Sequence, residues 1–284
     1  MRPYQVLISQ ALSEANPEYT LAALSGTTLA HGGVTSYLID GKNYTGYVWS
    51  DPYEGQHDLI QRSWHMNPLS DPASTNITCN NKGITVPGTF HASVTAGSSI
   101  RSTWVTPDGF GWPHTLGPVV AYMASCGEDC TTITDTSTLK WFKIAEEGLR
   151  DGYAIGEEDG WFQNDLWENR RTEYWNVTVP KDLKPGRYMI RHEIIMLELN
   201  PVQFYPDCAH LEVAGEGTLV PSDEYLVQFP GGYKLTGKWF KGTRSCLIDT
   251  DCDADPGIAV SGKVRGDLTT KVRTYTGLLH TFVP

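Results

Sequence analysis

One stretch of the chain brings together side chains that could do chemistry: a histidine, a glutamine and a tyrosine. It covers residues 188–213 and reads YMIRHEIIMLELNPVQFYPDCAHLEV. The pattern predicts two strands joined by a turn, and alternate residues of a strand share one face. His192 therefore shares a face with its apolar neighbours, and Gln203 shares one with Tyr205, while Phe204 points the other way. Such groups on one surface indicate a metal or polar site, or else a polar patch on a solvated sheet.

The pairing of these two strands decides which side chains meet. A hairpin centred between Leu197 and Glu198 makes His192 and Gln203 cross-strand neighbours. This register is a hypothesis, because the turn is not of a two-residue type. A zinc-protease motif is excluded, because HExxH needs a second histidine where this chain has Met196.

Length, composition and charge limit the class of protein. The 284 residues suit one large β domain or two small domains, and 40% hydrophobic with 19% charged residues is typical of a globular chain. No apolar run has the length of a membrane span, so we predict no membrane segment. The net charge of -11 repels phosphate backbones and argues against a nucleic-acid partner. A neutral polymer or a cation is a more suitable partner for such an acidic surface.

Cysteines and glycosylation sequons together indicate secretion. The sequons begin at Asn43, Asn76 and Asn176, and the chain has 6 cysteines, whose pairing the sequence alone does not choose. Residues 19–30, YTLAALSGTTLA, resemble the end of a signal peptide, and a cut after residue 30 leaves His31 first. The alternative is an uncleaved tail at residues 1–30.

The remaining pattern predicts an all-β fold. Short strands alternate with Gly and Pro turns, which is typical of a β-sandwich in one domain. We predict a single immunoglobulin-like or fibronectin-like antiparallel β-sandwich over residues 31–265, with long loops and one or two short helices, one of them at 138–150. Residues 235–254 and 266–284 fit no pattern and are either a genuine loop and tail or a gene-model artefact. Cys246 and Cys252 form the weakest candidate pair.

Five runs of sequence carry a resemblance to a known family. They are His31-Gly32, WPHTLGPVVAYMA, WFKIAEEGL, PGRYMIRHEIIMLE and QFYPDCAHLEV. In this order and spacing they resemble the fungal lytic polysaccharide monooxygenases of auxiliary activity family 9, once classed as glycoside hydrolase family 61. The likeness covers most of residues 31–233 and the DPGI run further on.

The resemblance implies a copper site of the histidine-brace type. His31 would bind one copper ion through its α-amine and a ring nitrogen, His114 would add a third nitrogen, and Tyr205 would lie on the axis. Amine and imidazole nitrogens in a tetragonal arrangement suit Cu(II). An amide nitrogen inside the chain cannot replace the free amine, so removal of residues 1–30 is part of the expectation.

Further roles are implied by the same resemblance. His192 and Gln203 would be polar neighbours of the copper ligands, with His192 able to supply a proton. The disulfides implied are Cys79–Cys208 and Cys126–Cys130. From the residues themselves, four aromatic side chains are candidates for a flat glucan-binding face, or else are scattered core and loop residues: Tyr53, Trp64, Tyr225 and Tyr233.

The function implied is oxidative cleavage of cellulose or a related β-1,4-glucan at C1 and/or C4 by a secreted monomer that receives electrons from an external donor. That donor would be a small reductant or a cellobiose dehydrogenase-like protein, and O2 or H2O2 would be the oxidant. A non-catalytic copper- or glucan-binding sandwich is the alternative if His31 is not the mature N-terminus. A β-glucanase is less supported, because no motif places the acid and base carboxylates that hydrolysis needs.

Overall fold

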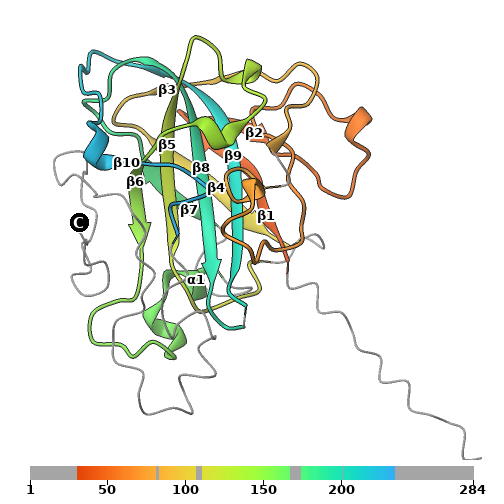
Figure 1. The fold of residues 1–284 in the computed structure, drawn as a ribbon, viewed down its shortest axis with the longest axis vertical. Helices are drawn as coiled ribbons and strands as arrows, with labels where there is room; N and C mark the ends of the chain where they lie inside the picture. The colour runs from red at the N-terminus through yellow and green to blue at the C-terminus, as the bar shows by residue number, and fades with distance from the viewer. Residues whose placement is uncertain (1–30, 81–82, 107–110, 167–173, 200, 234–284) are drawn as a thin grey trace, which may run out of the picture.

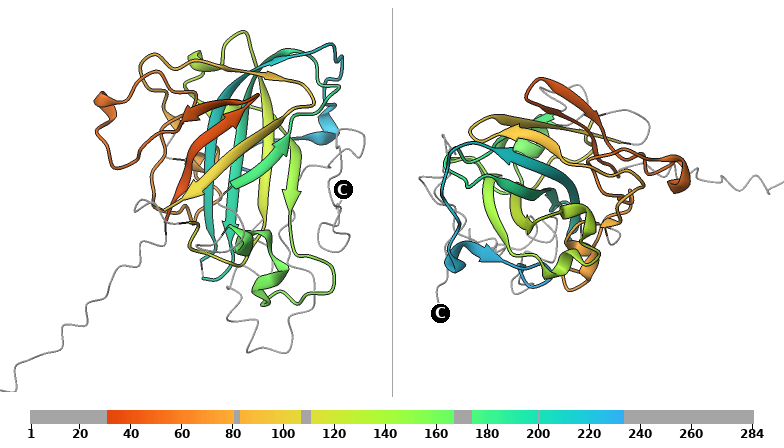
Figure 2. Two further views of the ribbon diagram at one scale, coloured as in Figure 1. Left: turned by 180° about the vertical axis from the view of Figure 1, so that it is seen from behind. Right: turned by 90° about the horizontal axis from the view of Figure 1, so that it is seen from above.

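The computed structural model describes residues 31–80, 83–106, 111–166, 174–199 and 201–233. These residues form two β-sheets stacked face to face, with long loops around them (Figure 1), and the view from above shows the two layers (Figure 2). Within the described part, no helix has the length and apolar character needed to cross a membrane. The predictions for residues 1–30, for the tail at 266–284 and for a Cys246–Cys252 pair lie outside the described residues.

The smaller sheet has four strands in the order β2-β1-β4-β7, and all its pairings are antiparallel. Alternate residues of the central strand β4 are buried, including Ile100 and Trp104, so one face of this sheet lies on the core. The bounds are β1 Gly33–Ile39, β2 Lys42–Thr45, β4 Ser99–Val105 and β7 Tyr174–Thr178.

The larger sheet has six strands in the order β10-β6-β5-β8-β9-β3. The bounds are β3 Ala92–Thr95, β5 Val119–Gly127, β6 Trp141–Glu147, β8 Gly186–Met196, β9 Gln203–Ala214 and β10 Leu226–Val227. Its pairings are antiparallel except for β3 with β9, which is parallel. The predicted all-β sandwich is confirmed, with this one parallel pair as an exception.

Both faces of the larger sheet are buried. Ile190 and Ile194 of β8 point into the core between the sheets, while Met189 and Ile195 point into a second apolar cluster on the outer side. The predicted division of faces is therefore confirmed, and Phe204 lies in the outer cluster as expected. Because neither face is open to water, the alternative of a solvated polar patch on this sheet is wrong.

The predicted register of the β8–β9 hairpin is wrong. Met196, not His192, faces Gln203, and His192 faces Asp207. The connection covers residues 197–202, so the hairpin is centred further along the chain than the predicted point between Leu197 and Glu198. The observed register differs from the predicted one by an even number of residues. Every side chain therefore keeps the predicted face of the sheet, while its cross-strand partner changes.

The helix predicted at 138–150 is also wrong, because β6 occupies most of that range. Phe142 and Ile144 point into the inner core and Trp141 into the outer cluster, which is the alternation of a strand. Lys143 is buried between them and reaches Glu146 at 2.7 Å. The short helices lie elsewhere: α1 at Phe162–Asp165, and 3-10 turns at Tyr53–Gly55, Thr75–Ile77, Cys130–Thr132, Thr136–Thr138, Glu158–Gly160 and Asp223–Tyr225.

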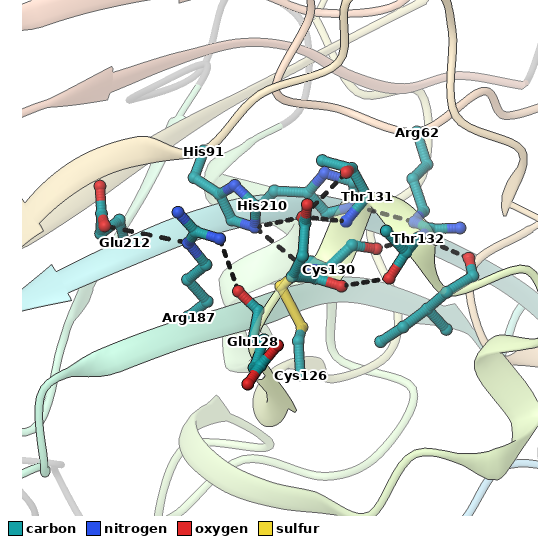
Figure 3. A network of polar contacts seen from close by, with 12 residues as sticks. Arg62, His91, Cys126, Glu128, Cys130, Thr131, Thr132, Arg187, His210 and Glu212 are labelled. Carbon is teal, nitrogen blue, oxygen red and sulfur yellow. Dashed lines mark hydrogen bonds and ion pairs between the residues drawn. A yellow bond between two sulfur atoms is a disulfide. The ribbon is translucent and has the colours of Figure 1, made fainter.

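Two disulfides connect loops to the larger sheet. Cys79–Cys208 and Cys126–Cys130 both form, as the resemblance implied. The second lies beside a buried polar network, where the Arg62 guanidinium donates to His210 Nε2 at 2.9 Å and to the Cys130 carbonyl at 2.8 Å (Figure 3). Burial lowers the pKa of His210 well below its ordinary value, and Arg62 lowers it further. The imidazole is therefore a neutral acceptor for Arg62.

The two disulfides should differ in their contribution to stability. Changing Cys79 and Cys208 together to alanine is expected to lower the free energy of unfolding by ~5 kcal/mol, because that bond links residues 129 apart in sequence. The same double change at Cys126 and Cys130, 4 apart, is expected to cost ~2 kcal/mol. Denaturant titration of both double variants measures the difference, and equal losses would contradict the dependence on loop length.

Candidate metal centre

The loop that carries His114 lies at the end of the sandwich where β8 stops and β9 begins. Backbone bonding ties it to β8, because the Leu197 N–H donates to the Leu116 carbonyl at 2.9 Å. Gly117 has φ of 132°, and a Cβ there would lie 1.9 Å from the Ile195 carbonyl oxygen, so only glycine allows this approach. The His114 side chain is 5% exposed in this loop.

Tyr205 and Gln203 of β9 meet His114 at this end. The Tyr205 hydroxyl donates to Gln203 Oε1 at 2.6 Å, and its oxygen lies 3.5 Å from His114 Nε2. Burial raises the pKa of Tyr205 above its ordinary value, and the nearby Glu198 carboxylate adds to the shift, so the phenol keeps its proton. That proton points to Gln203, and the phenolic oxygen faces the imidazole.

An aromatic wall supports this group. The Trp112 ring stands edge-on to Tyr205 with centroids 4.9 Å apart, and edge-on to His114 at 5.7 Å. Its indole N–H donates to Gln163 Oε1 at 3.0 Å, and Gln163 belongs to α1. In Figure 1, α1 and the β8–β9 turn lie at the same, lower end. The wall therefore fixes both rings from behind.

His31 lies just before β1, and β1 starts at this same end of the sandwich. Burial lowers the pKa of His31, and the charges of His114 and His65 lower it further, which makes these three imidazoles electrostatic neighbours. A neutral imidazole is the form that binds a metal ion. Gly32 leaves room for the close passage of β4, because a Cβ there would lie 2.4 Å from the Val105 carbonyl oxygen.

Sequence reasoning missed one residue of the site, Glu198. Its Oε2 lies 2.9 Å from His114 Nδ1, and its Oε1 accepts from the Thr115 N–H at 2.5 Å and the Leu116 N–H at 3.2 Å. Burial raises the pKa of Glu198, but the hydrogen bonds from His114, Thr115 and Leu116 outweigh it and hold the pKa below its usual value. The one signal in the sequence is a carboxylate directly after the apolar end of β8.

His192 is not brought into this group. It is fully buried between the sheets, with its ring 5.9 Å from that of Tyr37 and 6.1 Å from that of Trp175. Neither ring nitrogen has a hydrogen-bond partner among the described residues, and burial lowers its pKa to about 3. The neighbours of His192 are core residues, whereas His114 contacts the polar side chains of Glu198 and Tyr205.

The donor set fits copper. No group of three or more His, Cys, Asp or Glu side chains suited to a metal ion occurs among the described residues. A centre made of two imidazoles and an amine contains only two such side chains, His31 and His114. Imidazole and amine nitrogens are donors that suit Cu(II).

Two of the four aromatic residues proposed for a glucan-binding face are core residues. Trp64 is 3% exposed and donates to the Tyr47 carbonyl, and Tyr233 is 7% exposed with its hydroxyl on buried Glu193. Neither can offer a ring face to a polymer. Tyr53 packs partly buried against the Trp64 cluster and Tyr225 is half-buried. The alternative of scattered core and loop residues describes Trp64 and Tyr233.

Comparison with known proteins gives one consistent family. Residues 31–241 match the model of Auxiliary Activity family 9 (formerly GH61). The chain is 41% identical over 222 residues to AA9 family lytic polysaccharide monooxygenase B of Heterobasidion irregulare, covering 76% of this chain and 86% of that one. It is 37% identical to the lytic polysaccharide monooxygenase-like protein CEL1 of Agaricus bisporus, covering 75% of this chain but 64% of that relative's length.

Solved structures agree with the sequence relatives. The crystal structure of a cellulose-active polysaccharide monooxygenase from M. thermophila superposes with a TM-score of 0.68 at 32% identity. The match covers 82% of this chain and 100% of that one. The structural comparison and the sequence comparison therefore support the same family.

Burial of His192 has a consequence for pH dependence. Its folded-state pKa of about 3 lies below the ordinary value of 6.5, so below pH 6.5 the unfolded chain takes up a proton that the folded chain does not. This contribution to stability is complete above pH 6.5 and is lost as the pH falls toward 3. A His192→Phe variant keeps the ring and removes the titration. As the pH falls from 6 to 4, the wild type should lose stability that the variant keeps. The difference in free energy of unfolding, variant minus wild type, should therefore grow by on the order of 1 kcal/mol per pH unit.

Denaturant titrations at several pH values measure this difference. The control is His57→Phe, which makes the same substitution at a side chain that is 67% exposed. His192→Phe should also bind copper as wild type does. Loss of copper binding by a folded His192→Phe protein would contradict this placement and would show that His192 takes part in the metal centre.

Proposed function

The chain belongs to Auxiliary Activity family 9 and is a lytic polysaccharide monooxygenase, and on this premise we propose that it cleaves cellulose or a related β-1,4-glucan at C1 and/or C4. The mature protein begins at His31 in this proposal, after loss of residues 1–30. Two observations support His31 as the mature N-terminus. The family match begins at residue 31, and His31 is an electrostatic neighbour of His114. The cellulose part of the proposal is supported by the cellulose-active relative from M. thermophila.

Each residue of the centre has its own task in this proposal. His31, through its α-amine and imidazole, and His114, through Nε2, would hold one copper ion, and the Tyr205 hydroxyl lies beside His114 Nε2 at 3.5 Å. When bound, copper supplies the one-electron redox chemistry through which a reductant and O2 or H2O2 oxidise a sugar carbon. Gln203 holds the Tyr205 hydroxyl by accepting its hydrogen bond on Oε1 at 2.6 Å. Trp112 closes the back of the site to water.

One observation carries the proposal: the meeting of His114 Nε2 and the Tyr205 oxygen at 3.5 Å, at the end of the sandwich where β1 begins. An external electron donor is required, either a small reductant or a cellobiose dehydrogenase-like protein, and the enzyme is taken to act as a monomer. A β-glucanase is unsupported, because the carboxylate that lies at this site, Glu198, is bound to His114 and to two backbone N–H groups.

The direct test uses protein that starts at His31, copper, ascorbate and swollen cellulose. We expect oxidised oligosaccharides by mass spectrometry, and none when ascorbate or copper is omitted. His114→Ala should weaken copper binding by more than the ~10- to 100-fold typical of an outer partner, because it removes a ligand, and should abolish the products. Tyr205→Phe keeps the ring and should retain copper binding better than His114→Ala.

The matched control is the same chain with one extra residue before His31. It keeps every side chain and loses the α-amine, so it should fold normally and lose both tight copper binding and oxidised products. Unmodified oligosaccharides formed without ascorbate would indicate hydrolysis instead. Polymer binding with no products from the His31-first protein would indicate a binding module.

Secretion, which the proposal includes, has its own test. Asn43 and Asn176 are exposed on the small sheet and lie in one row across it, through Leu38 and Arg101. Protein secreted from a fungal host should carry N-glycans at these two asparagines, and glycosidase treatment should remove their mass. Absence of glycan from both sites in secreted protein would contradict this prediction.

The third sequon should be modified less. Asn76 is half-buried, and the hydroxyl of its Thr78 is fully buried and donates to the Phe229 carbonyl at 2.7 Å. Peptide mapping of the three asparagines measures the occupancy of each. Asn43→Gln and Asn176→Gln variants identify the two glycopeptides.

A further inference from the structure

We propose that Glu198 is a positioning residue for the metal ligand His114: its carboxylate fixes the imidazole with the proton on Nδ1 and so directs the Nε2 lone pair to the metal. This rests on the proposed function only for the identity of the metal. The arrangement itself does not depend on a bound metal ion. Neither the family match nor the names of the relatives assigns a role to this residue.

The carboxylate is held on both of its oxygens. Glu198 Oε1 accepts from the Thr115 N–H at 2.5 Å, the Thr115 hydroxyl at 3.1 Å and the Leu116 N–H at 3.2 Å. Those donors leave Oε2 directed at His114 Nδ1, at 2.9 Å. A backbone N–H can only donate, so the orientation of the carboxyl group is set by the same loop that carries His114.

The tautomer of His114 is set by this contact. An ionised carboxylate can only accept, so His114 Nδ1 must be the donor. In a neutral imidazole the other nitrogen, Nε2, is then without a proton and can bind a metal ion. Carboxylate–histidine–metal arrangements of this kind fix the ring and raise the basicity of the ligand nitrogen.

The other side of the ring is compatible with this assignment. Tyr205 Oη lies 3.5 Å from His114 Nε2, but the phenol donates its proton to Gln203 Oε1 at 2.6 Å. The shorter contact takes the only proton that the hydroxyl can donate. The phenol proton therefore lies toward Gln203 and not toward His114 Nε2, which agrees with a His114 ring that carries its own proton on Nδ1.

The test begins with the wild-type chain without metal. Nitrogen-15 NMR of its imidazoles, assigned with a His114→Gln variant, reports which ring nitrogen carries the proton. We expect the neutral His114 to have its proton on Nδ1. A proton on Nε2 in the wild-type copper-free protein overturns the proposal, whatever the variants do.

The variant that tests the cause is Glu198→Gln. It keeps the size and the Oε1 acceptor, but its amide N–H2 now faces Nδ1 and donates to it, so the proton of His114 should move to Nε2. Copper affinity, measured by titration calorimetry, should fall by about 10- to 100-fold. The Cu(II) EPR spectrum of the residual complex should change, which loss of global stability alone would not cause. Glu198→Asp, whose carboxylate is shorter and withdraws from Nδ1, serves as a second variant if Glu198→Gln does not fold.

The matched control is Glu146→Gln, because Glu146 is a comparably exposed carboxylate, 21% against 26%, held by Lys143 and outside the metal centre. It should leave the His114 tautomer and copper affinity unchanged. A folded Glu198 variant with wild-type tautomer and wild-type copper affinity overturns the proposal. Failure of the oxidation assay with the expected tautomer would instead overturn the proposed function and leave the role of Glu198 standing.

Discussion

The site depends on the backbone pairing that continues from β8 into the loop before β5. The Ile195 N–H donates to the Pro118 carbonyl at 3.0 Å, and the Leu197 N–H donates to the Leu116 carbonyl at 2.9 Å. These bonds prolong the β5–β8 ladder past the last paired residues and carry the His114 loop onto the sheet. A loop with strand-like backbone hydrogen bonds has less conformational freedom than an ordinary loop. It can therefore hold the His114 side chain in one position.

The same constraint brings the second half of the site into place. β8 and β9 form one hairpin, and its register sets Tyr205 opposite Ile194, within the strand segment to which the His114 loop is bonded. Glu198 lies just past the last paired residue of β8, where the chain is still close enough to reach the loop. Two segments far apart in sequence, which carry the proposed ligands at positions 114 and 205, are therefore fixed by one strand lying between them. Packing of Trp112 against both rings completes the support.

Parts of this arrangement could be predicted from the sequence because they are local. Alternation assigned the faces of β8 and β9 correctly, and the resemblance supplied both disulfides. The register could not be predicted, because the long connection lacks the turn chemistry that fixes short hairpins. Buried Lys143 and its partner Glu146 made β6 resemble a helix, because a charged pair inside a strand breaks the apolar alternation. Burial itself arises from distant segments: Tyr37 and Trp175 enclose His192, and nothing near His192 in the sequence indicates them.

Three histidines of the larger sheet and its loops show how surroundings decide chemistry. His192, between the sheets, has no partner for either nitrogen within the described part of the chain. Burial lowers its pKa to about 3, so the ring stays neutral at pH values well below the ordinary histidine pKa. His210, on the opposite face, is occupied as an acceptor by Arg62 (Figure 3). His114 meets a carboxylate on Nδ1, while its Nε2 lies 3.5 Å from the Tyr205 hydroxyl oxygen. An imidazole becomes a metal ligand when one nitrogen is held as a donor and the second presents a directed lone pair. At His114 the partner on Nδ1 is the carboxylate of Glu198, which follows the apolar run at the end of β8.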